Sequence, residues 1–170
     1  MKVVFRADAS STIGTGHIMR CLSLAQSLKN LGNEITFVCR ELPGNLCDAI
    51  EAQGFAMLRL KECKNEETFV YENEPMYASW LGTSWQLDAS ETYSLLEPLS
   101  PLDWLVVDHY ALDARWETAC RSLTKNLMAI DDLFDRSHDV DVLLNQNILP
   151  GDEKCYDGML PSSCRQYLGP

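Results

Sequence analysis

The sequence has little positive charge: 14 lysine and arginine residues stand against 25 aspartate and glutamate residues, a formal net charge of −11. Proteins that bind nucleic acids or anionic membranes usually attract phosphates through a basic surface. This charge balance therefore argues against a nucleic acid or a membrane as partner. The composition, 46% hydrophobic and 23% charged over 170 residues, is that of one globular domain with a sizeable core.

Segments for secretion or membrane insertion are also missing. The first eight residues reach a charged side chain after only three consecutive apolar residues, which is too short for the apolar core of a signal peptide. No apolar run approaches the roughly 20 residues of a membrane span. We therefore expect a cytoplasmic protein, and a monomer.

The seven cysteines include no Cys-x-x-Cys pair, and their number is odd. Zinc sites favour close pairs, and small secreted disulfide frameworks favour an even number. Buried reduced thiols are expected, and no metal or other cofactor is predicted. The triplet Asp139-Val140-Asp141 is of the kind with which some glycosyltransferases hold a metal. It is short enough to arise by chance, and we interpret it as the start of a strand.

Two kinds of apolar segment alternate along the chain. Short, uniformly apolar runs bounded by turn residues predict strands at Val3–Phe5, Ile35–Cys39, Phe55–Leu60, Trp104–Val107, Leu127–Ile130 and Val140–Leu144. Apolar residues at every third or fourth position predict helices at His17–Leu31, Cys47–Gln53, Asp88–Leu96 and Asp113–Lys125. The alternation predicts a doubly wound, mostly parallel α/β sheet of roughly five strands. The charged stretch Lys61–Pro75 is expected to be an exposed connection.

Ligands of such sheets bind at the carboxyl ends of the strands, so the loops at residues 7–16, 108–112 and 131–138 are candidates. The first of these loops ends in Gly14-Thr15-Gly16, directly before a helix. Glycine lets a ligand approach the backbone, and the free N–H groups of a helix start attract anions. The loop is no dinucleotide fingerprint, because Met19 stands where the third glycine would fall, and it is no Walker loop. A tight structural turn explains it equally well.

His17 is expected at the positive end of the dipole of the helix that follows this loop. That position favours the neutral imidazole, which can act as a general base. We expect its ring to reach solvent at the carboxyl edge of the sheet. Arg20, one helical turn later, either neutralises ligand charge or pairs with Asp8.

Two further groups of polar residues follow predicted strands. Asp108 comes directly after Val107, and capping of the next loop is its favoured role, whereas Tyr110 is suited to stacking on a sugar. The second group forms a polar rim after Ile130 and comprises Asp131, Asp132, Asp135, Arg136 and His138. We expect substrate contacts from these loops, at Arg6, Asp8, Gly14, Thr15, Gly16, Arg20, Asp108, Tyr110 and Asp132.

The stretch from Arg6 to Leu22, RADASSTIGTGHIMRCL, closely resembles the amino-terminal signature of the UDP-sugar hydrolases of pseudaminic-acid biosynthesis. Related spore-coat polysaccharide proteins carry a similar segment. Further similar motifs are WLG at 80–82, VVDHY at 106–110, IDDL at 130–133 and LLNQN at 143–147, so the resemblance runs through almost the whole chain. That family is similar to the GT-B glycosyltransferases, but it transfers the sugar to water.

The resemblance implies that residues 1–170 are the Rossmann-like amino-terminal half of a GT-B fold, and that a carboxy-terminal domain absent from this chain binds most of the UDP. It implies that His17 is the base for water attack, with inversion, at the anomeric carbon of a UDP-linked diacetamido-trideoxy sugar. Two alternatives stay open. One is another enzyme, either a GT-B-type glycosyltransferase or an amino-sugar acyltransferase partner; the other is a non-catalytic sugar-binding or assembly domain of a polysaccharide pathway.

Overall fold

The computed structural model describes residues 1–63, 74–147 and 155–169. Within these ranges the strands are β1 (Lys2–Ala7), β2 (Glu34–Arg40), β3 (Ala56–Leu60), β4 (Leu102–Asp108), β5 (Thr124–Ile130), β6 (Val142–Asn145) and β7 (Arg165–Leu168). The helices are α1 (Gly16–Asn30), α2 (Cys47–Ala52), α3 (Trp85–Leu96) and α4 (Ala114–Cys120), with 3₁₀ turns η1 (Ala78–Leu81), η2 (Glu97–Leu99) and η3 (Arg121–Leu123).

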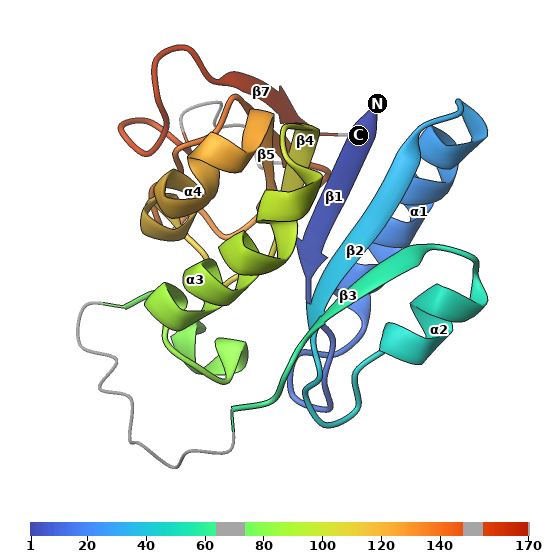
Figure 1. The fold of residues 1–170 in the computed structure, drawn as a ribbon. Coiled ribbons are helices and arrows are strands. Elements are labelled where there is room, and N and C mark those ends of the chain that lie inside the picture. Colours follow the sequence, from blue (N-terminus) through green and yellow to red (C-terminus); the bar gives the residue numbers. More distant parts are fainter. Residues whose placement is uncertain (64–73, 148–154, 170) are drawn as a thin grey trace.

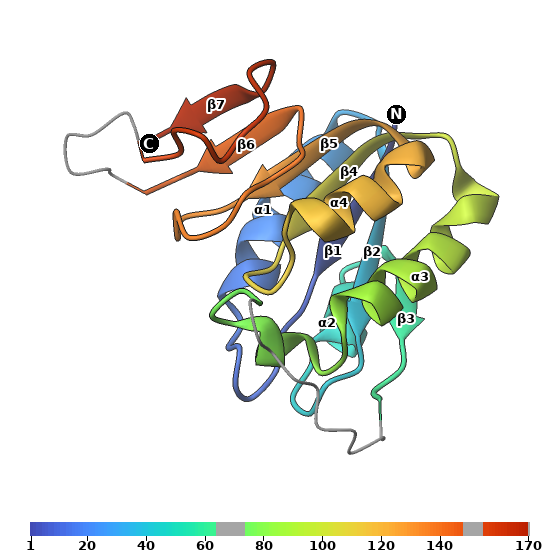
Figure 2. The same cartoon turned by 90° about the vertical axis from the view of Figure 1, so that its left-hand side faces the viewer.

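The seven strands form one parallel sheet in the order β3-β2-β1-β4-β5-β6-β7, which confirms the predicted α/β fold (Figures 1 and 2). Helices α1 and α2 pack on one face, over side chains such as Phe5 and Phe37. Helices α3 and α4 pack on the other face, over Val4, Val38 and Leu105. Because both faces are covered, the central strands are apolar throughout.

The order of the strands determines where a ligand can enter. From β1 the chain winds outward to β3, and then returns through α3 to β4, which pairs with β1 on its other side. The loops that follow β1 and β4 therefore leave the sheet toward opposite faces. Open α/β sheets bind ligands in the crevice at this switch in direction. The loop before α1 lies at this carboxyl edge, as the sequence predicted.

Some element boundaries differ from the prediction. The helix expected over Asp113–Lys125 ends at Cys120, and the chain joins β5 at Thr124. The cause is sheet pairing, since Thr124 is already in register with Leu102 of β4, and pairing overrides the helical spacing of the apolar residues. Strand β6 begins at Val142 instead of Val140.

The sheet has seven strands, one more than the six ranges predicted from the sequence, where a sheet of roughly five strands was expected. Strand β7 was not predicted because its residues are mostly exposed and form no apolar run. Most of the expected connection Lys61–Pro75 lies outside the described residues.

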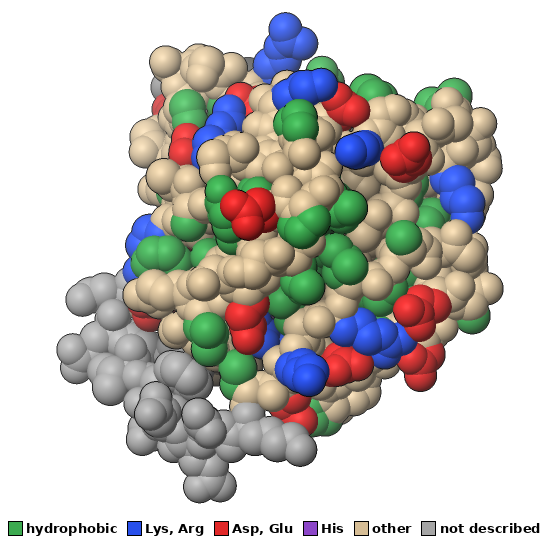
Figure 3. All heavy atoms as spheres, viewed as in Figure 1, with side chains coloured by type: hydrophobic (Ala, Val, Ile, Leu, Met, Phe, Trp, Pro, Cys, Tyr) green, Lys and Arg blue, Asp and Glu red, His purple; other side chains and the backbone are tan. Residues whose placement is uncertain are grey.

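Three further features of the fold concern the charged surface, the cysteines and the lengths of the helices. Acidic and basic side chains are interspersed on the face shown in Figure 3. Four of the seven cysteines, Cys21, Cys39, Cys47 and Cys120, are buried thiols, as expected, whereas Cys63, Cys155 and Cys164 are only partly buried. In the described part of the chain no helix is both long and apolar enough to cross a membrane.

Candidate active site

Two clusters of polar side chains lie at the switch between β1 and β4, on opposite faces of the sheet. Successive side chains of a strand point to opposite faces. At the end of β1, Arg6 and Asp8 lie on the α3 side, where Arg6 contacts Asp88 of α3. At the end of β4, Asp108 lies on the α1 side and contacts His17 and Arg20 of that helix. Strand alternation therefore separates the two clusters.

The cluster on the α1 side, called the site cluster below, consists of His17, Arg20, Asp108, Tyr110 and Asp132. Its centre is a hydrogen bond of 2.6 Å between His17 Nδ1 and Asp108 Oδ1. Arg20 donates from Nε and Nη2 to the two oxygens of the same carboxylate, at 2.5 Å each. The sequence suggested that Asp108 caps the next loop. Instead, its carboxylate joins the end of β4 to the first turns of α1.

These contacts assign the protons of His17. Burial opposes ionisation of Asp108, but the hydrogen bonds from Arg20 and His17 outweigh it and hold the pKa of Asp108 below its usual value. Nδ1 of His17 lies 2.6 Å from the Asp108 carboxylate and 3.3 Å from Arg20 Nη2. An ionised carboxylate only accepts hydrogen bonds, and its contact is the shorter one, so we place the proton on Nδ1. In the neutral imidazole Nε2 then has the free lone pair. It has no hydrogen-bond partner among the described residues, and it is not one of the fully buried unpaired atoms.

The sequence analysis expected the His17 ring to reach solvent, but most of the ring is buried. Its side chain is only 6% exposed. The ring of Tyr110 packs edge-on against it, with ring centroids 4.4 Å apart, and the ring of His109 stacks behind it at 6.2 Å. The sequence could not show this packing, because both neighbours come from the loop after β4. His17 does lie in the first turn of α1, as predicted.

Tyr110 and Asp132 complete the site cluster. The Tyr110 hydroxyl donates to Asp132 at 2.5 Å, and Asn147 Nδ2 donates to the same carboxylate at 2.8 Å. Burial and the bond to Asp132 raise the pKa of Tyr110 well above its usual value, so the phenol stays protonated. Arg20 Nη1 also reaches Asp132, at 3.5 Å, whereas the predicted alternative of pairing with Asp8 is wrong.

An aromatic wall, defined as Tyr77, Trp80 and Tyr110, borders the site cluster. The centroids of the Tyr77 and Trp80 rings are 4.5 Å apart, and those rings lie 5.5 and 5.9 Å from Tyr110. Tyr77 was not predicted as a site residue. It precedes the WLG motif by three residues, but nothing in the spacing alone placed it beside the loop after β4.

The loop Gly14-Thr15-Gly16 is exposed. Gly14 has φ +79°, a conformation that favours glycine, and its N–H closes a turn by donating to Ser10 at 2.8 Å. A Cβ atom added at Gly14 or Gly16 would meet nothing within 4 Å. Thr15 caps α1 without a side-chain hydrogen bond. The loop is therefore both a tight turn and an open surface beside a helix start.

The cluster on the α3 side, called the scaffold cluster below, consists of Arg6, Asp8, Arg40, Asp88 and His109. Arg6 forms ion pairs with Asp8 and Asp88 at 2.6 Å each, and Arg40 pairs with Asp88 at 2.8 Å. The side chains of these four residues have no exposed surface. Arg6 and Asp8, expected as substrate contacts, therefore reach no substrate in this conformation.

The polar residues that follow β5 form contacts within the protein. Arg136 pairs with Asp131 at 2.8 Å, and His138 Nδ1 lies 2.7 Å from Glu117. The two carboxylates of the Asp-x-Asp triplet are also occupied: Asp139 accepts from Thr118, and Asp141 pairs with Arg121. Among the described residues no group of three histidine, cysteine or acidic side chains is arranged to hold a metal ion.

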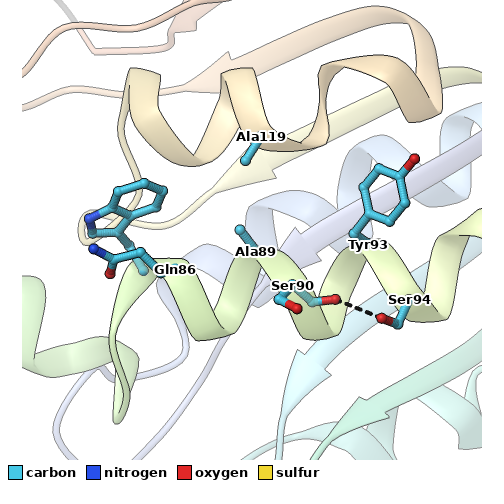
Figure 4. A pocket seen from close by; sticks show the side chains of 7 residues that line it. Gln86, Ala89, Ser90, Tyr93, Ser94 and Ala119 are labelled. Atoms are coloured by element: carbon cyan, nitrogen blue, oxygen red, sulfur yellow. Dashed lines mark hydrogen bonds between the residues drawn. The ribbon is translucent and has the colours of Figure 1, made fainter.

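One pocket lies away from both clusters, between α3 and α4 (Figure 4). Its lining includes Trp85, Tyr93, Ala119 and Ser94, and the Ser94 hydroxyl donates to a backbone carbonyl of α3 at 2.9 Å. None of the predicted site residues lines it. It opens on the outer surface of the helical layer, so we do not assign it to the site.

Comparison with known proteins gives one result that agrees with the motifs. No family model matches the chain. The chain is similar to a UDP-sugar hydrolase. It is 28% identical over 172 residues to UDP-2,4-diacetamido-2,4,6-trideoxy-beta-L-altropyranose hydrolase of Campylobacter jejuni, a match that covers 99% of this chain and 50% of that protein. This similarity confirms the resemblance seen in the sequence. The chain spans about half the length of the curated relative that it matches.

Proposed function

We propose that this chain supplies the general base for hydrolysis of a UDP-linked diacetamido-trideoxy sugar. The observation that carries the proposal is the hydrogen bond of 2.6 Å between His17 Nδ1 and Asp108, which leaves Nε2 of His17 as the basic atom at the carboxyl edge of the sheet. The printed name of the relative supplies the substrate class.

In the proposed reaction, His17 Nε2 takes a proton from water while the water oxygen bonds to the anomeric carbon. The bond from that carbon to the diphosphate oxygen breaks, and UDP leaves from the opposite face, so the configuration inverts. Asp108 stabilises the imidazolium that forms and fixes its orientation, as the carboxylate of a catalytic triad does. The open loop Gly14–Gly16 and the start of α1 favour the negative charge of the diphosphate.

We also propose that residues 1–170 are the base-bearing domain of a two-domain protein of the nonulosonic acid pathway. The match to one half of the relative supports this division. Most contacts to UDP are then expected from the second domain. The 170-residue chain alone should turn over UDP-sugar poorly, and robust hydrolysis by the purified chain at low concentration would contradict this division.

A labelling experiment tests the reaction. The two-domain protein is incubated with the UDP-sugar of the relative in ¹⁸O-water without any acceptor, and UDP and free sugar are analysed by mass spectrometry. We expect stoichiometric release of both products, with the label in the sugar and none in UDP. Turnover that requires an added acceptor would indicate the alternative glycosyltransferase, and label in UDP would show attack at phosphorus. Binding without turnover would indicate a sugar-binding or assembly domain.

A further inference from the structure

A pocket of about 210 Å³ opens beside the aromatic wall, and no predicted site residue lines it. It lies between the loop after β1, the connection from β2 to α2, and the turn η1. Ser10, Ser11 and Thr12 form one side, Leu42 and Pro43 the second, and Trp80 the third. In Figure 2 these three segments come together at the carboxyl edge of the sheet.

Two glycines hold the walls of this pocket close together. A Cβ atom on Gly82, at φ +68°, would lie 2.8 Å from Leu42 Cδ2. A Cβ atom on Gly44 would lie 3.0 Å from the backbone nitrogen of Ser11, which donates to Pro43 at 2.9 Å. Glycine permits both close approaches, so the pocket is a defined feature of the fold.

The hydroxyl groups of the pocket have complementary hydrogen-bonding capacity. Ser10 Oγ accepts backbone N–H groups from Thr12 and Ile13, at 3.1 and 2.9 Å, so its own proton is available to donate. Ser11 Oγ donates to the Pro43 carbonyl at 3.2 Å, so its lone pairs are available to accept. The lining thus offers a donor and an acceptor on two successive residues, together with the apolar groups of Leu42, Pro43 and Trp80.

This combination fits one common substituent of sugars. An acetamido group presents a carbonyl that accepts, an N–H that donates and a methyl group that favours an apolar wall. Distance also fits, because Trp80 lies 5.9 Å from Tyr110, which lies 4.4 Å from the His17 ring. A monosaccharide can bridge such a span.

We propose that this pocket binds the acetamido group of an N-acylated amino sugar whose anomeric carbon faces His17. The orientation toward His17 rests on the proposed function, whereas recognition of the acetamido group does not. Ser10 donates to the acetamido carbonyl, Ser11 accepts from its N–H, and the methyl group packs on Leu42 and Trp80.

The test uses the ¹⁵N-labelled 170-residue chain and two probes that differ only at this substituent, methyl 2-acetamido-2-deoxy-β-D-glucopyranoside and methyl β-D-glucopyranoside. NMR spectra follow the backbone amides of residues 10–12 and the indole N–H of Trp80. The acetamido glycoside should shift these signals saturably, and the glucoside should bind at least fivefold more weakly. Equal shifts from both probes, or shifts confined to other residues, would overturn the proposal.

Variants locate the interaction. Ser11→Ala removes one neutral hydrogen bond and should weaken binding of the acetamido glycoside about fivefold. Ser11→Thr keeps the hydroxyl and should restore binding. The matched control is Ser94→Ala, which makes the same change in the pocket between α3 and α4 and should leave binding unchanged. If Ser11→Ala binds the acetamido glycoside as tightly as the unmodified chain, the assignment of the pocket is wrong.

The two proposals fail differently. If the acetamido glycoside binds this pocket but His17→Asn leaves hydrolysis intact in the two-domain protein, the proposed function fails and the pocket assignment stands. If hydrolysis depends on His17 but the acetamido glycoside does not perturb residues 10–12, the pocket assignment alone is wrong.

Discussion

The site cluster and the scaffold cluster use the same residue types at the same edge of the sheet, but they differ in exposure. The four charged side chains of the scaffold cluster have no exposed surface. In the site cluster, Arg20 and Asp132 are 14% and 15% exposed, and no described residue forms a hydrogen bond with Nε2 of His17. The comparison teaches that carboxylates, arginines and histidines become structural when closed in by the protein and available for chemistry when one atom stays accessible.

The two clusters also differ in charge balance. The scaffold cluster pairs two arginines, Arg6 and Arg40, with two aspartates, so its buried core is neutral. The site cluster sets one arginine against Asp108 and Asp132, and so carries one surplus negative charge. The neutral balance suits groups that are fully buried, whereas the surplus charge lies where Arg20 and Asp132 keep contact with solvent.

The largest expected effect concerns the scaffold cluster. Asp88→Asn leaves two buried guanidinium groups undercompensated and should cost about 3–5 kcal/mol of unfolding free energy. Urea denaturation measures this loss. The control is Asp103→Asn, which breaks a surface pair with Lys125 and should cost less than about 1 kcal/mol. If both variants lost similar amounts of unfolding free energy, the burial of the scaffold cluster would not make its ion pairs more important for stability than a surface pair.

The next effect concerns the site cluster. Asp108→Asn can donate to Nδ1 of His17, which would move the imidazole proton to Nε2 and block the base. The rate at saturating substrate should fall by up to the hundredfold to ten-thousandfold that a general base contributes. The loss of stability should be smaller than for Asp88→Asn, because Arg20 is partly solvated and keeps its contact with Asp132. A variant that keeps more than half the rate would show that Asp108 does not position His17.

The smallest effect is a pH dependence from His109. Burial, followed by the charge of Arg6, lowers the pKa of His109, although a close contact of 3.3 Å with Asp8 opposes the shift. Its ring is therefore neutral when folded and gains a proton on unfolding below the usual histidine value of about 6.5. Stability from this group is present above that pH and lost below it, by up to about 1.4 kcal/mol per pH unit.

His109→Gln should remove this component. Unfolding free energies of both proteins at pH 7.5, 6.5 and 5.5 measure the difference between their slopes. Slopes that agree within error would show that His109 is not held neutral by its burial.

The sequence predicted the elements that carry the site because each has a strong local signal. Val3 to Phe5 are uniformly apolar, and the spacing of Ile18, Leu22 and Ala25 is helical. The carboxyl ends of parallel strands meet at one edge, so Asp108 and Asp132 were expected near His17. The structure brings all three together with Arg20.

The scaffold cluster could not be predicted in the same way. In the sequence Asp88 resembles any polar residue in the first turn of a helix, and Arg40, the last residue of β2, resembles any charged residue at the end of an apolar run. Their pairing with Arg6 depends on how α3 crosses the sheet, which no local spacing encodes. The burial of His17 escaped prediction for the same reason, since the rings of His109 and Tyr110 reach it from the loop after β4.

The most direct test of the account is the rate of UDP release by the two-domain protein carrying His17→Asn, measured at saturating UDP-sugar together with its affinity for that substrate. The account predicts a fall in rate of about a hundredfold to ten-thousandfold, with affinity nearly unchanged because most contacts to UDP are expected from the second domain. Near-normal turnover, or a loss of affinity in proportion to the rate, would contradict it, and the base would then have to be sought at Asp132, because the other sequence candidate, Asp8, is fully buried in the scaffold cluster.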